Sequence, residues 1–233
     1  MNWTMKYGLL GIFFASTFAA QSWAQDASKP TVVPMTNAAY HVFTFQDENM
    51  VLESVTLPPG ASTGYHSHDQ DLFFAITGGA KVKNQALGKE PVELELKLGQ
   101  IVYTPYTKTP GTHRITNLEK EHAMRLLAVA FTREPGHYKV LPRSSKYEVA
   151  MDNDRLRVWR LKLAPGESAP LIEQRAPGGR MVVAGGTVVE KRPGKPDQPM
   201  VLKNHDFTTT AIEQRGIENV GSSAIEFVEF ELK

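Results

Sequence analysis

The sequence predicts an all-β protein, and three observations support this fold class. Segments rich in Val, Ile, Phe and Tyr are short, and few stretches keep the spacing of an amphipathic helix. Turn sequences such as Pro58-Pro59-Gly60 and Thr77-Gly78-Gly79 separate these segments. The second half of the chain repeats the pattern of the first. Short strands with regular turns favour an antiparallel sandwich or a jelly-roll barrel.

The N-terminus predicts export. An apolar run without charge, Gly8–Ala20, follows a segment whose one charged residue is Lys6, and small residues end at Ala24. This pattern is typical of a secretory signal peptide. A membrane anchor is the alternative, but the run is shorter than the ~20 residues of a span. We therefore expect a signal peptide at 1–24, a flexible tether at 25–34, a periplasmic or secreted protein and no stable membrane anchor.

The composition of the chain argues against several classes of function. Loss of Lys6 with the leader leaves equal numbers of basic and acidic residues, so the charge favours neither nucleic acid nor anionic lipid as a partner. The chain has no cysteine, which excludes disulfides, thiolate nucleophiles and thiolate metal ligands. A bound metal would have to use histidine, carboxylate or water.

Seven candidate strands occupy the first half of the chain. They are Ala39–Phe45, Met50–Leu57, Leu72–Ile76, Val92–Lys97, Gln100–Thr104, His113–Asn117 and Met124–Thr132. The second half echoes them, because Met50–Gly60 and Leu156–Gly166 both run as alternating strands into Pro-Gly. This indicates a tandem duplication, with domains at 35–135 and 148–233 joined by a linker at 136–147.

Metal-ligand chemistry is concentrated between Gly60 and Gly78, in a chain with only seven histidines. His66 and His68 lie two residues apart. On a β-strand such residues project to the same face, so both side chains can bind one ion.

These residues resemble the motifs of the cupin superfamily. Gly60, His66, His68 and Gly78 match the first motif, and Gly99, Pro105, His113 and Asn117 match the second. The acidic position of the first motif holds Asp71 instead of the family's Glu, on a shorter loop. The resemblance covers nearly all of the mature chain and implies two tandem cupin jelly-roll barrels.

The resemblance also implies a metal site in the first barrel. Its ligands would be His66, His68 and His113, with Asp71 either a fourth ligand or a hydrogen-bond partner of a ligand histidine. Three imidazoles and a carboxylate suit one divalent ion, such as Zn, Cu, Mn, Fe or Ni.

The second half has the same pattern of strands and turns but lacks these ligands. Counting from Gly166 puts Ile172 and Gln174 at the positions of His66 and His68, Gly178 at the Asp71 position and Arg215 at the His113 position. We expect a degenerate C-terminal barrel that supports the first one by packing. The alternative is an anion bound by Arg180 or Arg215.

Other candidates carry weaker signals. We take Tyr65, Phe73 and Tyr103 as substrate-binding residues, although aromatic strand residues such as these, Phe74 and Tyr106 more often belong to the core. A surface or packing role is expected for the remaining histidines, which are His41, His122, His137 and His205.

The sequence leaves three functions open. The first is a metal-dependent enzyme of dioxygenase, isomerase or lyase type acting on a small oxygenated molecule. The second is a cupin that binds a small ligand without catalysis, and the third is a structural or metal-storage protein. No general base has motif-level support. A homodimer is possible, and each half is long enough to fold without metal.

Overall fold

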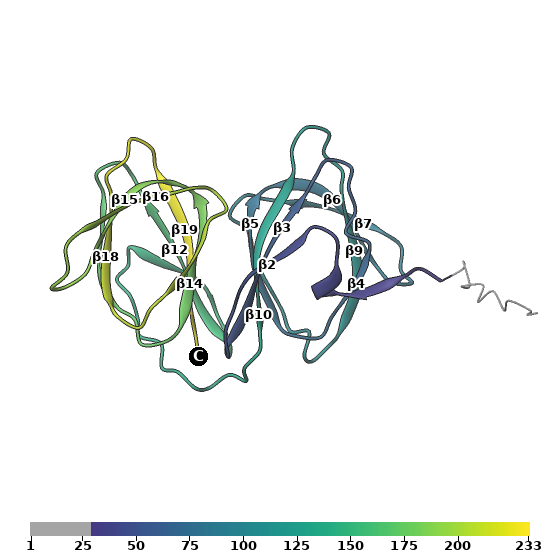
Figure 1. Ribbon diagram of the computed structural model, residues 1–233, viewed down its shortest axis with the longest axis horizontal. Helices are drawn as coiled ribbons and strands as arrows, with labels where there is room; N and C mark the ends of the chain where they lie inside the picture. The colour runs from purple at the N-terminus through teal and green to yellow at the C-terminus, as the bar shows by residue number, and fades with distance from the viewer. Residues whose placement is uncertain (1–28) are drawn as a thin grey trace, which may run out of the picture. The chain divides into compact units, whose positions relative to one another are not determined.

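The computed structural model describes residues 29–233, and both barrels lie in the compact unit Thr31–Lys233. The predicted signal peptide, residues 1–24, lies outside the described residues. The first barrel contains the short helix η1 (Met35–Asn37) and the strands β1 (Val32–Pro34), β2 (His41–Gln46), β3 (Met50–Leu57), β4 (Tyr65–His68), β5 (Leu72–Gly78), β6 (Ala80–Ala86), β7 (Val92–Leu96), β8 (Ile101–Thr104), β9 (Gly111–Asn117) and β10 (Met124–Phe131) (Figure 1).

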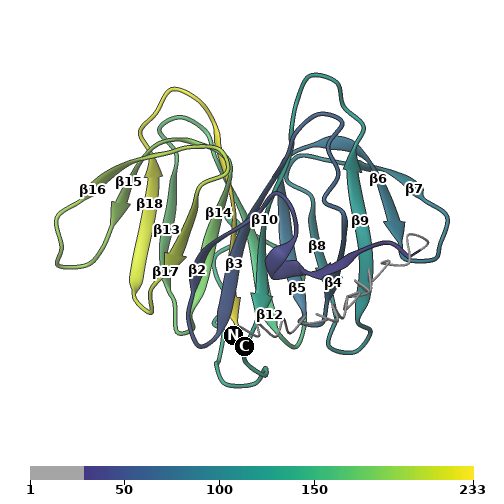
Figure 2. The ribbon, with the colours of Figure 1, turned by 45° about the vertical axis from the view of Figure 1, so that its right-hand side comes forward.

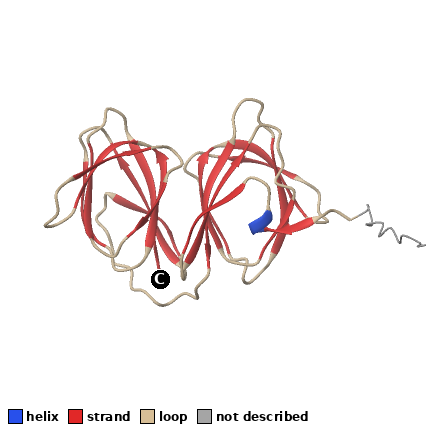
Figure 3. Cartoon of the chain, in the orientation of Figure 1, coloured by secondary structure: helices blue, strands red, loops and turns tan. Residues whose placement is uncertain are grey.

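The second barrel repeats this plan after a segment, residues 132–146, that has no helix or strand. Its strands are β11 (Tyr147–Asp152), β12 (Leu156–Leu163), β13 (Ser168–Glu173), β14 (Gly178–Ala184), β15 (Gly186–Lys191), β16 (Gln198–Leu202), β17 (Phe207–Thr210), β18 (Gln214–Asn219) and β19 (Ile225–Leu232). Figure 3 shows that strands make up nearly all of the regular structure, which confirms the predicted all-β class.

Each barrel is formed by two facing sheets (Figure 2). In the first barrel the strand orders are β1-β4-β9-β6-β7 and β2-β3-β10-β5-β8. In the second they are β13-β18-β15-β16 and β11-β12-β19-β14-β17. The seven predicted strands all overlap observed ones, and the prediction for Met50–Leu57 coincides with β3.

The predicted tether is partly ordered, which corrects the sequence-based expectation. Val32–Pro34 forms β1 and pairs in parallel with β4, so that Val33 lies opposite His66. β1 is therefore the edge strand of this sheet, and it lies beside β4, which carries two candidate ligands. Pro34 ends this strand at the sheet edge, a position that tolerates a residue without a backbone N–H.

The two barrels share one apolar core. The sheet containing β3, β10 and β5 contributes Leu52, Phe73 and Val129, and the second barrel contributes Met181 and Phe230 among others. The rings of Phe73 and Phe230 meet edge to face, with centroids 5.6 Å apart. Each barrel therefore buries the outer face of its neighbour's sheet, as expected for sheets that are apolar on both sides.

Polar contacts fix the same interface. The His205 ring lies 2.7 Å from the Ser54 hydroxyl through Nε2 and 2.6 Å from the Thr77 hydroxyl through Nδ1. Burial lowers the pKa of His205, which keeps the ring neutral in this position. These bonds match the packing role expected for this histidine.

The duplication extends to individual hydrogen bonds. The Asn117 amide donates to the carbonyls of Leu57 and His122, and Asn219 donates in the same way to Leu163 and Ser223. Both asparagines are fully buried. The strand register also refines the comparison of the halves: Gly178 begins β14 as Leu72 begins β5, so Pro177 rather than Gly178 occupies the Asp71 position.

Within residues 29–233, no helix reaches the length and apolar character that crossing a membrane requires.

Candidate metal centre

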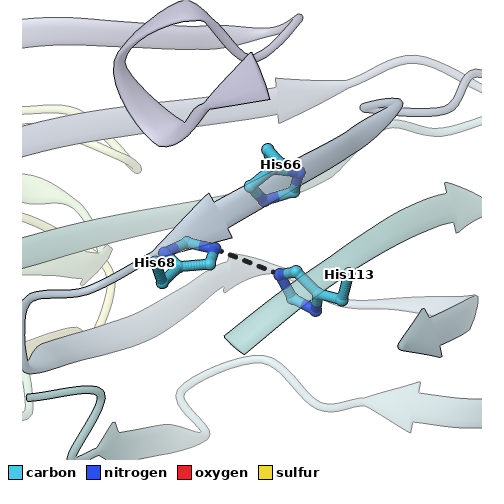
Figure 4. Close-up of side chains that lie close together, drawn as sticks. All are labelled: His66, His68 and His113. Atoms are coloured by element: carbon cyan, nitrogen blue, oxygen red, sulfur yellow. Dashed lines mark hydrogen bonds between the residues drawn. The ribbon is translucent and has the colours of Figure 1, made fainter. Parts of the chain in front are cut away.

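Three histidines converge inside the first barrel (Figure 4). His66 and His68 come from β4, His113 comes from β9, and the two strands pair so that His66 lies opposite His113. The candidate ligand atoms of the three rings all lie within 4.8 Å of one another. Strand alternation brings the first two to one face, and the antiparallel pairing adds the third.

Hydrogen bonds orient two of the rings. The Nδ1 atom of His66 lies 3.1 Å from the Gly64 carbonyl, and that of His113 lies 3.0 Å from the Asn84 side-chain oxygen. Both partners accept hydrogen bonds, so each Nδ1 carries the proton and each Nε2 keeps its lone pair. This is the arrangement that supports metal ligation by histidine.

The third ring is fixed by stacking. His68 lies against the Tyr106 ring, with centroids 4.7 Å apart and planes 11° apart. Space for Tyr106 depends on Gly111, since a Cβ there would lie 2.8 Å from a ring carbon of the tyrosine. The absence of a side chain at this position therefore allows Tyr106 to cover His68.

The three rings are neutral at physiological pH. Burial lowers the pKa of His66 and of His113 to about 4. Burial, together with the neighbouring His113 and His66 rings, lowers the pKa of His68 to about 3. Neutral imidazoles are the form that binds metal, so protons compete weakly for this site above pH 5.

The geometry of this group fits a divalent cation. The Nε2 atoms of His68 and His113 lie 3.2 Å apart, although both are potential ligands with a lone pair. A proton or a cation must therefore lie between them. The Nδ1 atom of His68 is also buried without a hydrogen-bond partner among residues 29–233.

The structure does not bring Asp71 into this group, which corrects the expectation of a fourth ligand. One carboxylate oxygen accepts hydrogen bonds from Tyr103 Oη at 2.7 Å and Arg155 Nε at 3.0 Å. The other accepts from Thr107 N at 2.9 Å and from the Thr107 hydroxyl. Although burial opposes it, these bonds hold the Asp71 pKa at about 2. Asp71 joins the two barrels, because Arg155 belongs to the second one.

A cavity of about 280 Å³ lies beside the histidines. Its polar lining includes His41, Glu53 and Asn84 besides the histidine group. Most of the remaining wall is apolar, and its members include Val55, Phe74, Val82, Val102, Ile115 and Leu126. Concave, mainly apolar cavities with some polar groups are typical of small-molecule sites.

The predicted substrate-binding residues are not among the cavity-lining residues. Phe73 is buried in the core between the barrels, and Tyr103 donates its hydroxyl proton to Asp71. Tyr65 lies under the guanidinium of Arg114, 4.9 Å from its ring centroid. The reason is alternation along each strand, because the residues facing the cavity are their immediate neighbours, such as His66 and Phe74.

Sequence reasoning missed several polar residues of this cavity, with His41 and Glu53 among them. His41, expected to have a surface or packing role, lies with its ring centroid 4.9 Å from that of His66. Glu53 is 2% exposed and reaches the cavity from β3. An inward-facing charge in the alternating strand Met50–Leu57 was the one available signal, and both faces of that strand are buried.

Buried ion pairs lie beside an apolar core in the second barrel. Glu229 accepts hydrogen bonds from Arg143 at 2.6 Å, Arg180 at 2.6 Å and Arg215 at 3.2 Å. Against the effect of burial, these three guanidinium groups keep the Glu229 pKa far below its usual range. Arg180 also pairs with Glu190 and Arg143 with Glu231, so three buried carboxyl groups face the three guanidinium groups, which argues against the anion-binding alternative. Ile172 pairs with Arg215 as His66 pairs with His113.

Comparisons with known proteins support the fold. No protein-family model and no curated protein sequence matches the chain. Among solved structures, AerE from Microcystis aeruginosa is 11% identical with a TM-score of 0.62, covering 88% of this chain and 97% of its own. A cupin 2 conserved barrel domain protein from Leptotrichia buccalis is 9% identical, with a TM-score of 0.52 over 83% of this chain and 88% of its own.

A third similar structure is Bacillus subtilis oxalate decarboxylase, described with Mn(II) centres. It is 13% identical, with a TM-score of 0.51 over 79% of this chain and 69% of its own. The chain therefore has the cupin fold, in a two-barrel arrangement with a histidine group able to bind metal in the first barrel. Identities this low establish the fold and not the reaction.

Proposed function

We propose that the first barrel binds one divalent metal ion through His66, His68 and His113. We further propose that the protein is an enzyme of dioxygenase, isomerase or lyase type that acts on a small oxygenated molecule. The observation that carries this proposal is the position of three neutral, converging imidazoles in the wall of a mainly apolar cavity. Three protein ligands leave coordination positions for substrate, as in catalytic metal sites.

A bound ion would supply a Lewis acid or redox centre that stabilises negative charge on an oxygenated substrate. The protein's own residues would orient the metal ligands and exclude water from the bound molecule. Gly64 and Asn84 fix two of the rings, Tyr106 holds the third, and the apolar wall excludes water around the bound molecule.

The metal could be Zn, Cu, Mn, Fe or Ni. The similar Bacillus subtilis oxalate decarboxylase has Mn(II) centres. For this chain, export is also part of the proposal, since the N-terminal sequence has the pattern of a signal peptide. A protein that folds outside the cytoplasm would take up Cu or Zn before Mn or Fe by the usual order of affinities.

Binding without catalysis is the second candidate, and the apolar character of the cavity favours it. Apolar atoms form most of the surface of this cavity. Such a wall can hold a small amphipathic ligand by burial alone.

Metal-loaded and chelator-treated protein should be incubated with small carboxylic, hydroxy and keto acids, oxalate included, and substrate consumption followed by NMR. We expect the loaded protein alone to consume at least one of them, and a His68→Ala variant to lose this activity. His122→Ala is the matched control, because His122 is outside the cavity. A molecule that binds the apo protein equally well and emerges unchanged would favour the binding role.

A further inference from the structure

Glu53 is a buried carboxyl group for which the proposed metal chemistry gives no role. It lies on β3, is 2% exposed and lines the cavity. Its Oε2 atom has no hydrogen-bond partner among residues 29–233. A buried polar group without a partner is costly, so its presence in a cavity wall needs an explanation.

On β10 the cross-strand neighbour of Glu53 is the small residue Ala128, and on β2 it is Phe43. In the second barrel the equivalent pair is Trp159 and Glu229, both fully buried, and Arg143 covers the Trp159 ring at 3.9 Å. In the second barrel these two positions therefore hold large buried side chains. In the first barrel they hold Glu53 and the small residue Ala128.

Glu53 and the histidines enter the cavity from different sheets. Glu53 belongs to the sheet that contains β3 and β10, whereas β4 and β9 carry the histidines in the facing sheet (Figure 2). Apolar side chains, which include Val55, Phe74 and Leu126, form much of the remaining lining. The cavity thus has polar groups on two facing walls and apolar surface beside them.

Glu53 is not a further member of the histidine group. Within the described chain, it makes no ion pair or hydrogen bond with the histidines and does not belong to the cluster of candidate ligands. Burial raises the Glu53 pKa to about 7, so near neutral pH it can donate or accept a hydrogen bond. A cation is not required to satisfy it.

We propose that Glu53 recognises a hydroxyl or carbonyl group at the end of the ligand remote from the histidines. The ligand class is then a short amphipathic acid: its carboxylate lies at the histidine group, its body lies in the apolar part, and a second oxygen meets Glu53. This inference rests on the proposed function, because the carboxylate end requires the bound metal.

Matched pairs of acids test the proposal. The probes are unbranched alkanoates of about four to eight carbons and the ω-hydroxyalkanoates of the same length, titrated calorimetrically into Zn-loaded protein. At the best-fitting length we expect the hydroxy acid to bind about tenfold more tightly, since a buried hydrogen bond to a carboxyl group is gained. Glu53→Met should abolish or reverse this preference, and Glu53→Gln should keep part of it.

Glu95→Met is the control, because it removes an exposed carboxyl group from the same barrel. It should leave the preference unchanged. Equal binding of the paired acids at every length, an unchanged preference in Glu53→Met, or no binding of any acid to metal-loaded protein would overturn the inference. Elemental analysis of the same samples separates the two proposals: without metal the proposed function fails, and with metal but no hydroxyl preference only the role of Glu53 fails.

Discussion

At the residue scale, the candidate metal centre depends on hydrogen bonds that hold uncharged rings. The Nδ1 protons of His66 and His113 are directed to Gly64 and Asn84, and burial keeps both rings neutral. Asp71, by contrast, has both oxygens occupied by groups that include Arg155 of the second barrel. The carboxylate at the acidic position of the first cupin motif therefore connects the two barrels.

Replacing Asp71 tests this assignment. Asp71→Asn should leave the metal content unchanged and lower the free energy of unfolding by about 3 kcal/mol, because the buried Arg155 loses its charge partner. Elemental analysis and denaturant unfolding of the same preparation measure the two effects. Loss of metal with unchanged stability would show that Asp71 is a ligand after all.

Glu53 should give the stability a distinct pH dependence. Burial raises its pKa to about 7 in the folded protein from an ordinary value of 4.5, so the folded state binds the extra proton between these values. Stability contributed by the protonated form is therefore lost as pH rises to 7. The metal-free Glu53→Gln variant should gain up to about 3 kcal/mol relative to wild type between pH 4.5 and pH 8. A difference that does not change with pH would contradict this.

The limits of sequence reasoning are visible at single residues. The histidine triad could be predicted because its spacing follows a known family motif. Tyr103 and Phe73 were assigned to the wrong face, since alternation fixes only which residues share a face and both faces of these strands are buried. Glu53 and His41 carry no motif, and only the strand pairing brings them to the cavity.

At the scale of elements, the turns after β9 and β18 are braced in the same way. Asn117 and Asn219 each tie the end of their strand to two backbone carbonyls. The positions of most strands could be predicted because Pro and Gly mark their ends. β1 could not, because its three residues pair with a strand more than 30 residues away and carry no alternating pattern of their own.

The two asparagines should have equal structural effects and no chemical role. Asn219→Ala should lower the free energy of unfolding by about 2 to 3 kcal/mol, because buried carbonyls lose their donors. Asn117→Ala should have a similar effect, and both variants should retain metal. Thermal unfolding with metal analysis measures this; a loss of metal in Asn117→Ala without loss of stability would point instead to a direct role in the site.

At the scale of the whole molecule, the two barrels differ in what their interiors contain. The second contributes Met181, Val228 and Phe230 to the shared core, while its own interior combines an apolar cluster with buried ion pairs. The first keeps a cavity with the histidine group. The core between them does not include the candidate ligands, so we expect folding not to depend on the ion.

Chelation should therefore leave the protein folded. We expect the far-UV circular dichroism spectrum to stay unchanged after treatment with EDTA, with a lower melting temperature because bound metal stabilises the native state by mass action. Cooperative unfolding on chelation at room temperature would refute this and favour a structural role for the metal.

The most direct test of the central claim is the metal content of the purified chain. Wild type should contain about one divalent ion per chain, as three histidine ligands predict for one site. The His66→Ala/His113→Ala double variant should contain less than about one tenth of that, while His122→Ala should match wild type. Equal, substoichiometric metal in wild type and the double variant would contradict the account.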